Sequence, residues 1–290
     1  MINKYKNKIQ TNIKANVQAR LGHVHSAKKS LGQNFLKSKP VLKMMCKAGS
    51  VVSSDVILEI GPGKGALTSN LLLGARKVLA IEKDNELFEF LKEKFASEIK
   101  NKTLQLIHED ILNLEVKKFG LKKNEYKIIA NIPYNITGAI FKKFLSNETQ
   151  PKTMILLVQK EVAERIVAKN KKESILSLSV KAYGEPKYIM KVEKRFFSPA
   201  PKVDSAIIAI TNISKKNFAS EIEEINYFNI IKAGFAHKRK ILCKNLTSVQ
   251  ARPGQVGRIF EKLKINPKAR AEDIKIENWL EISRLLSTDI

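Results

Sequence analysis

The sequence predicts an α/β fold, in which a mostly parallel seven-stranded sheet is followed by a small all-α C-terminal domain. Short apolar runs alternate with helical patterns between residues 56 and 210, which is typical of a parallel sheet. A glycine-rich turn separates the first strand from its helix. After about Asn217 the strand signal fades and apolar residues recur at helical spacing. At 290 residues, the chain is long enough for one main core and a smaller second unit.

Each expected element follows from its local pattern of apolar residues and breakers. We expect strands over residues 56–60, 77–81, 104–108, 127–130, 154–158, 188–192 and 206–210, the last two as an antiparallel pair. Helices are expected over residues 40–48, from the glycine-rich turn through residue 73, over 85–95 and over 161–168. The chain therefore divides into a basic arm (residues 1–28), an α/β domain (29–215) and a helical domain (216–290), with the second boundary near residues 213–218.

The charge is strongly basic: 53 Lys and Arg face 28 Asp and Glu, a formal net charge of +25. Residues 1–29 and residues 231–260 each hold seven basic side chains and no acidic one. Clustered cations of this kind neutralise phosphates and favour a nucleic-acid partner. A lysine-rich solvated surface would explain part of the charge, and a basic membrane-surface protein is disfavoured because no strongly amphipathic segment is present.

Other protein classes are disfavoured by what the chain lacks. No apolar run approaches the roughly 20 residues that span a bilayer, and the N-terminus has no apolar signal region. The two cysteines, Cys46 and Cys243, form no disulfide framework and no metal-ligand spacing, although one disulfide is formally possible. We therefore expect a cytoplasmic protein without a bound metal.

The first chemical constellation is residues 59–65, Glu-Ile-Gly-Pro-Gly-Lys-Gly, at a junction of strand and helix. Gly61 and Gly63 allow a ligand to approach the backbone without a Cβ in the way. Glu82 ends the second strand, where a carboxylate can accept hydrogen bonds from ribose hydroxyls, and Asp110 follows the third strand, where it could hold an adenine amine. Pro62 departs from the pyrophosphate fingerprint, so a nucleoside cofactor such as S-adenosylmethionine is favoured over a dinucleotide or a simple turn.

The second constellation, Asn-Ile-Pro-Tyr at residues 131–134, follows the fourth strand into the same cleft. The amine of adenine is a poor nucleophile because its lone pair is delocalised into the ring. The Asn131 amide oxygen and the Pro133 carbonyl could accept both amine protons and stabilise the positive charge that develops on nitrogen. The Tyr134 ring offers a surface on which a base stacks. Without this context, the four residues would be a proline turn with a core tyrosine.

Five motifs, in order, resemble the ribosomal RNA adenine dimethyltransferases, and the match is closest to the KsgA branch, which modifies two adjacent adenines in the 3′-terminal hairpin of small-subunit (16S) ribosomal RNA. They are residues 28–36 (Lys-Lys-Ser-Leu-Gly-Gln-Asn-Phe-Leu), 59–63, 131–135, 159–165 and 197–205. The resemblance covers about residues 28–286. It implies a Rossmann-like class I S-adenosylmethionine-dependent methyltransferase fold, with residues 29–215 as the catalytic domain and residues 216–290 as an RNA-binding domain.

The resemblance also implies a role for each matching residue. The cofactor pocket would be closed by Asn34 and Leu36 and lined by Gly61, Gly63, Glu82, Asp110 and Asn131. Asn131, Pro133 and Tyr134 would address a target adenine flipped out of its stack, with Phe197 packing on its other face. Lys202, Lys238, Arg239 and Lys240 would contact RNA phosphates. Phe197 could instead be a core aromatic, and each lysine could simply lie on a solvated face. The family resemblance implies a monomer.

Several residues depart from the family pattern. Ile132 is usual in the Erm enzymes, which methylate large-subunit RNA, and residues 174–180 lack a Tyr-Gly-Arg found in many relatives. Lys238 replaces an arginine, which exchanges a planar fork for a point charge. Two alternatives follow: an Erm-like methyltransferase, and a ribosome-assembly or organellar transcription factor that keeps the fold but acts only by binding. The intact residues 131–134 disfavour the second alternative.

Overall fold

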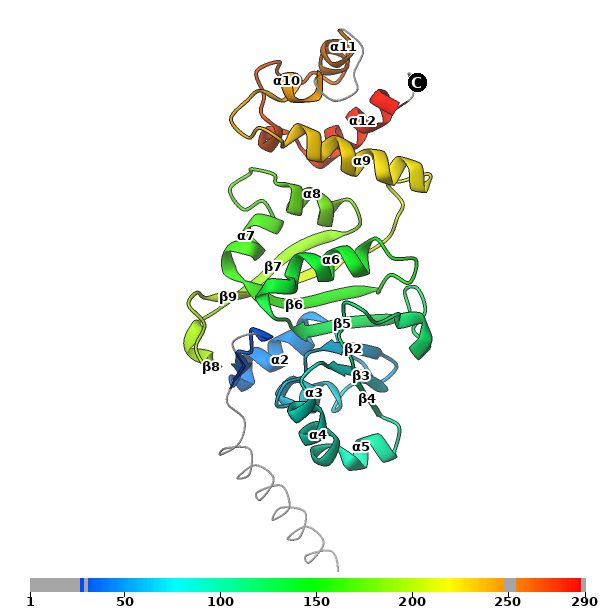
Figure 1. Ribbon diagram of the computed structural model, residues 1–290, viewed down its shortest axis with the longest axis vertical. Helices are drawn as coiled ribbons and strands as arrows, with labels where there is room; N and C mark the ends of the chain where they lie inside the picture. The colour runs from blue at the N-terminus through cyan, green and yellow to red at the C-terminus, as the bar shows by residue number, and fades with distance from the viewer. Residues whose placement is uncertain (1–26, 29–30, 248–253, 288–290) are drawn as a thin grey trace, which may run out of the picture.

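Seven strands form one mixed sheet in the computed structural model, which describes residues 27–28, 31–247 and 254–287 (Figure 1). The strands are β2 (Val56–Ile60), β3 (Lys77–Glu82), β4 (Leu104–His108), β5 (Tyr126–Asn131), β6 (Thr153–Gln159), β7 (Glu185–Val192) and β9 (Ser205–Thr211). Their order is β4-β3-β2-β5-β6-β9-β7, and β9 runs antiparallel to both of its neighbours. The expected α/β class, the seven strands and the antiparallel final pair are confirmed. Most of the basic arm expected over residues 1–28 lies outside the described residues.

The strand order creates a switch point that places the site. From β2 the chain moves outward to β3 and β4, and it then returns to the other side of β2 to form β5. Loops at the carboxyl ends of β2 and β5 therefore diverge, and ligands of open α/β sheets bind in the crevice that this divergence leaves. Both chemical constellations of the sequence lie at these ends.

Helices cover both faces of the sheet, because side chains along each strand alternate between two buried clusters. Ile57 and Ile129 belong to one cluster, whereas their neighbours Leu58 and Ile128 belong to the other. The first face is covered by α2 (Lys39–Ala48), α3 (Ala66–Leu71), α4 (Asn85–Lys94) and α5 (Ala96–Lys100), and the second by α6 (Thr137–Leu145), α7 (Lys160–Ile166) and α8 (Ile175–Lys181).

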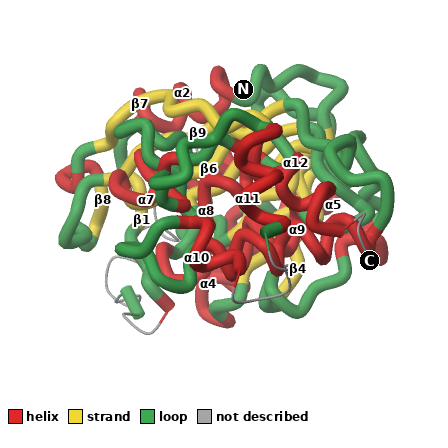
Figure 2. Tube along the Cα trace, turned by 90° about the horizontal axis from the view of Figure 1, so that it is seen from above, coloured by secondary structure: helices red, strands yellow, loops and turns green. Residues whose placement is uncertain are grey.

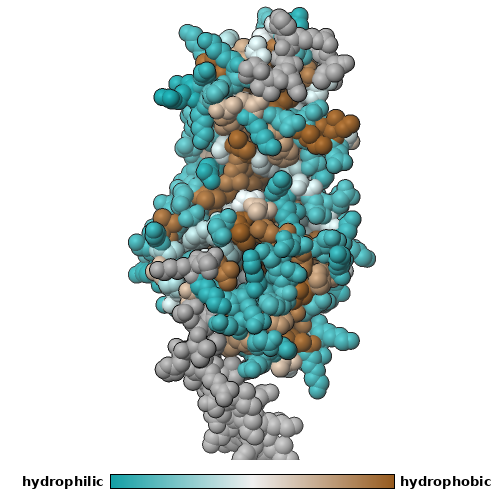
Figure 3. All heavy atoms as spheres, viewed as in Figure 1, coloured by the Kyte–Doolittle hydropathy of each residue, from teal (hydrophilic) through white to brown (hydrophobic). Residues whose placement is uncertain are grey.

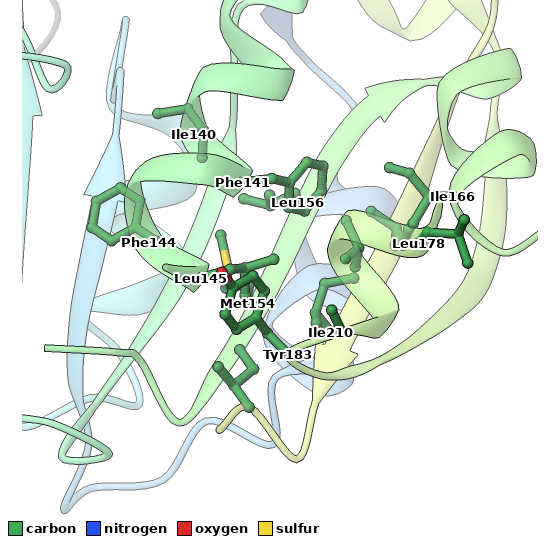
Figure 4. Packing of buried hydrophobic residues seen from close by; sticks show 14 of the residues in the cluster. Ile140, Phe141, Phe144, Leu145, Met154, Leu156, Ile166, Leu178, Tyr183 and Ile210 are labelled. Carbon is green, nitrogen blue, oxygen red and sulfur yellow. The ribbon is translucent and has the colours of Figure 1, made fainter. Parts of the chain in front are cut away.

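Helices α6 and α8 are not among the elements predicted from the sequence. Figure 4 shows Phe141, Phe144 and Leu145 of α6 packed with Met154 of β6 in the second cluster, and all four side chains are buried. Residues 174–180, which depart from the family pattern, form the N-cap and nearly all of α8. The Ser174 hydroxyl accepts a hydrogen bond from the Ser177 amide at the helix N-terminus. This segment does not line the cleft described below.

Four further helices gather at one end of the molecule, beyond α8 (Figures 1 and 2). They are α9 (Glu221–Gly234), α10 (Leu242–Thr247), α11 (Gln255–Lys262) and α12 (Ile276–Ser287). Aromatic rings join them to the α/β part: Tyr183, after α8, stacks on Phe228 of α9 at a centroid distance of 5.9 Å. The Tyr183 hydroxyl also donates to the carboxylate of Glu224, which Lys215 contacts at 2.9 Å. The buried core is therefore continuous across the boundary expected near residue 215.

A small second sheet, which the sequence analysis missed, joins two distant motifs. Strand β1 (Phe35–Leu36) pairs antiparallel with β8 (Phe197–Ser198), and the Lys37 amide donates to the Phe196 carbonyl at 2.8 Å. Strands of two residues carry too little periodicity to be read from sequence. Their pairing fixes the segment around Asn34 beside the main sheet.

Within the described residues, no helix is long and apolar enough to cross a membrane. The same part of the chain contains no group of three or more His, Cys, Asp or Glu side chains that could hold a metal ion. Cys46 and Cys243 are free thiols. Burial raises the pKa of the Cys46 thiol to about 11, which keeps it protonated and unreactive at neutral pH.

Candidate active site

A cleft at the carboxyl ends of β2 to β5 brings together most of the residues that the sequence singled out. Those that line it are Asn34, Leu36, Gly61, Gly63, Glu82, Asp110, Asn131, Pro133 and Tyr134. They come from five separate segments of the chain, which the strand order of the main sheet and the β1–β8 pairing bring together. Phe197, Lys202, Lys238, Arg239 and Lys240 do not line this cleft.

The glycine-rich loop forms the floor of the cleft through backbone conformations that favour glycine. Gly61 has φ +64° and Gly63 has φ +58°, in the left-handed region. A Cβ on Gly61 would meet nothing within 4 Å, so this backbone faces open space, whereas one on Gly63 would lie 2.9 Å from the Phe35 ring. A ligand can thus approach the backbone at Gly61, while Gly63 is required for packing against Phe35.

Glu82 ties this loop to the second strand. Its Oε2 accepts a hydrogen bond from the Gly63 amide at 3.0 Å, and its Oε1 accepts one from the Asp84 amide at 2.9 Å. Burial raises the pKa of Glu82 above its ordinary value, although these hydrogen bonds oppose the shift. Because each carboxylate oxygen has a second lone pair, Glu82 can still accept hydrogen bonds from two adjacent hydroxyls of a ligand.

Glu59 lies at the base of the cleft and is almost fully buried, with 1% of its surface exposed. Burial raises the pKa of Glu59 to about 8, and the nearby charge of Glu82 adds to the shift. Glu59 is therefore predominantly protonated at neutral pH.

Asp110 lines the cleft just after the end of β4. Its Oδ2 forms an ion pair with Lys83 Nζ at 2.8 Å, and its Oδ1 accepts from the Leu112 amide at 2.9 Å. Burial alone would raise the pKa of Asp110, but these two contacts outweigh it and hold the pKa below its ordinary value. Asp110 is thus a fixed anion near the mouth of the cleft.

Asn131 ends β5 with its amide in a defined orientation. Its Nδ2 donates a hydrogen bond to the Asn34 carbonyl at 3.1 Å, across 97 residues of sequence. Because this contact directs Nδ2 toward the segment that carries Asn34, Oδ1 remains available as an acceptor. The segment that carries Asn34 is itself fixed by the β1–β8 pairing.

Tyr134 follows in a single 3-10 turn and is anchored at its hydroxyl. That hydroxyl and the Ser205 hydroxyl lie 2.6 Å apart and share a hydrogen bond. Burial raises the pKa of Tyr134 above its ordinary value, so the phenol stays protonated. The carbonyl of Pro133 already accepts a hydrogen bond from the Ile136 amide at 3.2 Å and has one lone pair left.

Three residues of this arrangement were not identified from the sequence: Gln33, Asp84 and Ser205. Gln33 and Ser205 lie in the motifs at residues 28–36 and 197–205, but the sequence assigns neither of them a role. Asp84 shows only the ordinary signal of a helix N-cap before α4. Asp84 Oδ1 accepts from the Glu86 and Leu87 amides, and its Oδ2 accepts from Gln33 Nε2 at 3.0 Å.

Phe197 lies in β8 and is buried, with 2% of its surface exposed. Its ring packs in the buried cluster that includes Leu36 and Val192. In this conformation the ring belongs to the hydrophobic core and does not line the cleft. Lys202 is exposed in the connection between β8 and β9.

The basic run at residues 238–240 lies in an exposed turn after α9. Asn245 of α10 fastens this turn, because its Nδ2 donates to the carbonyls of Gly234 (2.6 Å) and His237 (3.2 Å). Three cations are thereby presented on a defined backbone.

A second hollow of about 1300 Å³ extends from α6 to α9, and Lys238 lies on its border. Figure 3 shows apolar atoms between α8 and α9 on a mainly hydrophilic surface. Ile175 and Ile225, which line the hollow, are 39% and 51% exposed. The lining carries charges of both signs, such as Arg165 and Lys232 on one hand and Glu161 and Glu221 on the other.

Comparison with known proteins matches residues 24–288 to the family described as ribosomal RNA adenine dimethylase. A relative from Fusobacterium nucleatum, the "Ribosomal RNA small subunit methyltransferase A", is 37% identical over 260 residues, which cover 89% of this chain and 97% of the relative. The protein of the same name from a Nostoc species is 36% identical over 273 residues, covering 90% of this chain and 98% of the relative.

Solved structures agree with this similarity. A dimethyladenosine transferase from Plasmodium falciparum aligns with a TM-score of 0.73 and 25% identity, covering 86% of this chain and 95% of that one. The 23S rRNA methyltransferase ErmE aligns with a TM-score of 0.71 at 24% identity, covering 87% and 99%, which shows a shared fold.

Proposed function

Since the chain belongs to the ribosomal RNA adenine dimethylase family, we propose that it dimethylates the exocyclic amine of adenines in small-subunit ribosomal RNA, with S-adenosylmethionine as methyl donor. The targets are two adjacent adenines of the 3′-terminal hairpin, as the resemblance of the motifs implies, and the protein acts as a monomer. The observation that carries the proposal is the oriented amide of Asn131, whose oxygen remains an acceptor beside the cleft.

The cleft fits a nucleoside cofactor. Glu82 would accept hydrogen bonds from ribose hydroxyls, the open backbone at Gly61 would take the close approach of the ligand, and Asp110 would accept from the adenine amine. When bound, S-adenosylmethionine supplies an electrophilic methyl group. Asn34 and Leu36 lie in the segment that covers the cleft, and they would exclude water from its occupant.

Two acceptors would act on the target amine. Asn131 Oδ1 and the remaining lone pair of the Pro133 carbonyl would accept its two protons, which favours a pyramidal nitrogen and stabilises the positive charge that develops there. Both groups are held before substrate arrives: the Asn131 amide by Asn34, and the Pro133 turn by Ile136. Such preorganisation places the nucleophile without reorganisation cost.

Tyr134 would stack on the flipped base, with its ring position set by the hydrogen bond to Ser205. Its raised pKa keeps the phenol protonated at neutral pH, so it does not serve as a base. No base is required, because the methylated ammonium is acidic and releases its proton to water. Phe197 would reach the second face of the base only after moving from its buried position.

The cationic residues would hold RNA outside the cleft. Residues 238–240 form a fixed turn of three exposed cations, and Lys202 is exposed next to the β8 strand. Phosphate contacts at these positions would position the hairpin and add affinity that depends on salt but not on sequence.

The similarity to relatives named as small-subunit methyltransferases favours small-subunit RNA as the substrate over large-subunit RNA. The 24% identity to ErmE indicates only a shared fold. A binding-only factor is disfavoured by the intact cleft residues. The test is a competition assay in which small ribosomal subunits and naked large-subunit RNA are offered together with S-adenosylmethionine. Dimethyladenosine confined to the small subunits supports the proposal. Product in large-subunit RNA, or cofactor that binds without product in either substrate, refutes it.

A further inference from the structure

Residues 31–36 lie over the cleft and contact several of its walls; we name them the cover segment. All six line the cleft. The Asn34 carbonyl accepts from Asn131, the Phe35 ring packs at Gly63, and a Cβ on Gly32 would lie 3.3 Å from Oδ1 of Asn135. An occupant of the cleft is therefore enclosed by this segment on one side.

The two ends of the cover segment are held by different kinds of contact. Its C-terminal end is fixed by backbone pairing, since Leu36 pairs with Phe197 and the next amide, of Lys37, donates to the Phe196 carbonyl. Leu36 is also buried. This end is part of the hydrophobic core and of a sheet, so it opens only with considerable unfolding.

The N-terminal end is held on one buried carboxylate oxygen. Asp84 Oδ2 accepts a hydrogen bond from Gln33 Nε2 at 3.0 Å and forms an ion pair with Lys28 Nζ, also at 3.0 Å. Lys28 Nζ reaches Glu86 at 3.3 Å, and its backbone amide donates to Gln33 Oε1 at 2.8 Å. The Asp84 side chain is fully buried, whereas that of Lys28 is 39% exposed.

The second oxygen of Asp84 is not needed for helix capping. Oδ1 alone accepts from the Glu86 and Leu87 amides, so an asparagine would cap α4 equally well. The buried negative charge is used by Lys28 and Gln33. Burial would raise the pKa of Asp84, but the hydrogen bonds from Lys28, the Leu87 amide and Gln33 hold it below its ordinary value, so the carboxylate stays ionised at neutral pH.

We propose that Lys28, Gln33 and Asp84 form a latch that holds the cover segment closed over the cofactor and thereby sets the rate of cofactor release. The inference rests on the proposed function, because it takes the cleft as the S-adenosylmethionine site. The three are positioning residues. They act through the cover segment, whose Asn34 in turn orients Asn131. Release requires breaking the latch contacts, while the paired end at Leu36 stays in place.

The test measures S-adenosylmethionine release from the full chain by stopped-flow displacement, with affinity from calorimetry. Lys28→Met and Gln33→Met each remove one latch group, and Asp84→Asn removes the charge but keeps the cap. Lys28→Arg preserves the ion pair. Lys92→Met is the matched control, since it breaks an exposed 3.3 Å ion pair with Glu89 on the same helix as the Asp84 cap.

We expect the release rate to rise about 5-fold in Lys28→Met, as for a partly exposed ion pair, and about 10-fold or more in Gln33→Met and Asp84→Asn, which lose a hydrogen bond to a charged group. Lys28→Arg and Lys92→Met should release cofactor like the original protein. Salt should accelerate release in the original protein and much less in Lys28→Met, because it screens the ion pair.

If the original protein binds the cofactor and the three latch variants release it at an unchanged rate, the latch proposal is overturned. The proposed function is then left intact. Release rates that rise only together with a lower Tm, at unaltered salt response, would place the three residues in fold stability and also overturn it. If the original protein binds no S-adenosylmethionine, the cofactor assignment fails, and the latch fails with it.

Discussion

Replacing Asn131 by alanine should separate catalysis from binding and from stability. Among the described residues, the side chain makes one hydrogen bond, from Nδ2 to the Asn34 carbonyl at 3.1 Å, and its Oδ1 is the proposed acceptor for the target amine. Loss of the internal hydrogen bond should cost about 1 kcal/mol of unfolding free energy, a fall in Tm of roughly 2–4 °C for a protein of this size. Loss of a preorganised transition-state group costs far more, about 10²–10³-fold in kcat.

The assay is steady-state methyl transfer to small subunits, which gives kcat, with RNA affinity measured by filter binding and Tm by calorimetry. Asn70→Ala is the matched control, because the Asn70 amide also donates to a backbone carbonyl, that of Ala66 at 2.9 Å, but does not line the cleft. We expect kcat to fall only in Asn131→Ala, with RNA affinity nearly unchanged in both variants. Parallel losses of kcat and RNA affinity, or similar kcat losses in both variants, would refute the assigned role.

Three further predictions concern other parts of the structure. Tyr134→Phe and Ser205→Ala should each lower the rate of methyl transfer only a few-fold and to the same extent, because each breaks the same anchoring hydrogen bond. Tyr134→Ala should lower it further, because it also removes a stacking surface worth about 1–3 kcal/mol. Different transfer rates for Tyr134→Phe and Ser205→Ala would contradict a role through this one hydrogen bond. Glu59 keeps its proton in the folded protein up to about pH 8 but loses it near 4.5 when unfolded, so the stability it contributes should decline as pH rises through this window, by at most about 1.4 kcal/mol per pH unit. Glu59→Gln should therefore show a smaller fall in Tm between pH 6 and 8, and an unchanged pH dependence would argue against a protonated Glu59. Neutralising residues 238–240 should weaken RNA binding and flatten its salt dependence, with a reduction in the slope of about 0.7–0.9 per lost phosphate contact; an unaltered slope would remove this turn from the interface.

Much of the fold was predictable because its strands are buried and strongly apolar. Strands β2, β3 and β6 are runs of aliphatic residues bounded by turns, and the sequence placed their limits within one or two residues. Helices α6 and α8 were missed: α6 begins immediately after the Asn-Ile-Pro-Tyr turn, and α8 is only seven residues long. The periodic signal of short helices is weak, so the sequence predicts some of them, such as α7, and not others.

The candidate site was predictable in its members but not in its connections. Loop glycines and strand-end carboxylates are local signals, so Gly61, Glu82 and Asp110 could be named from the sequence. The contacts of Asn131 with Asn34 and of Tyr134 with Ser205 span 97 and 71 residues and depend on strand order. Phe197 shows the limit most clearly, since a motif gives its identity but not its buried position.

The most direct test of the central claim is the transfer of radiolabelled methyl from S-adenosylmethionine to small ribosomal subunits from a strain that lacks this modification. We predict label in dimethyladenosine of the small-subunit RNA with the original protein, and almost none with Asn131→Ala. Absence of label with the original protein, under conditions in which it binds the cofactor, would contradict the account and indicate a protein that acts by binding alone.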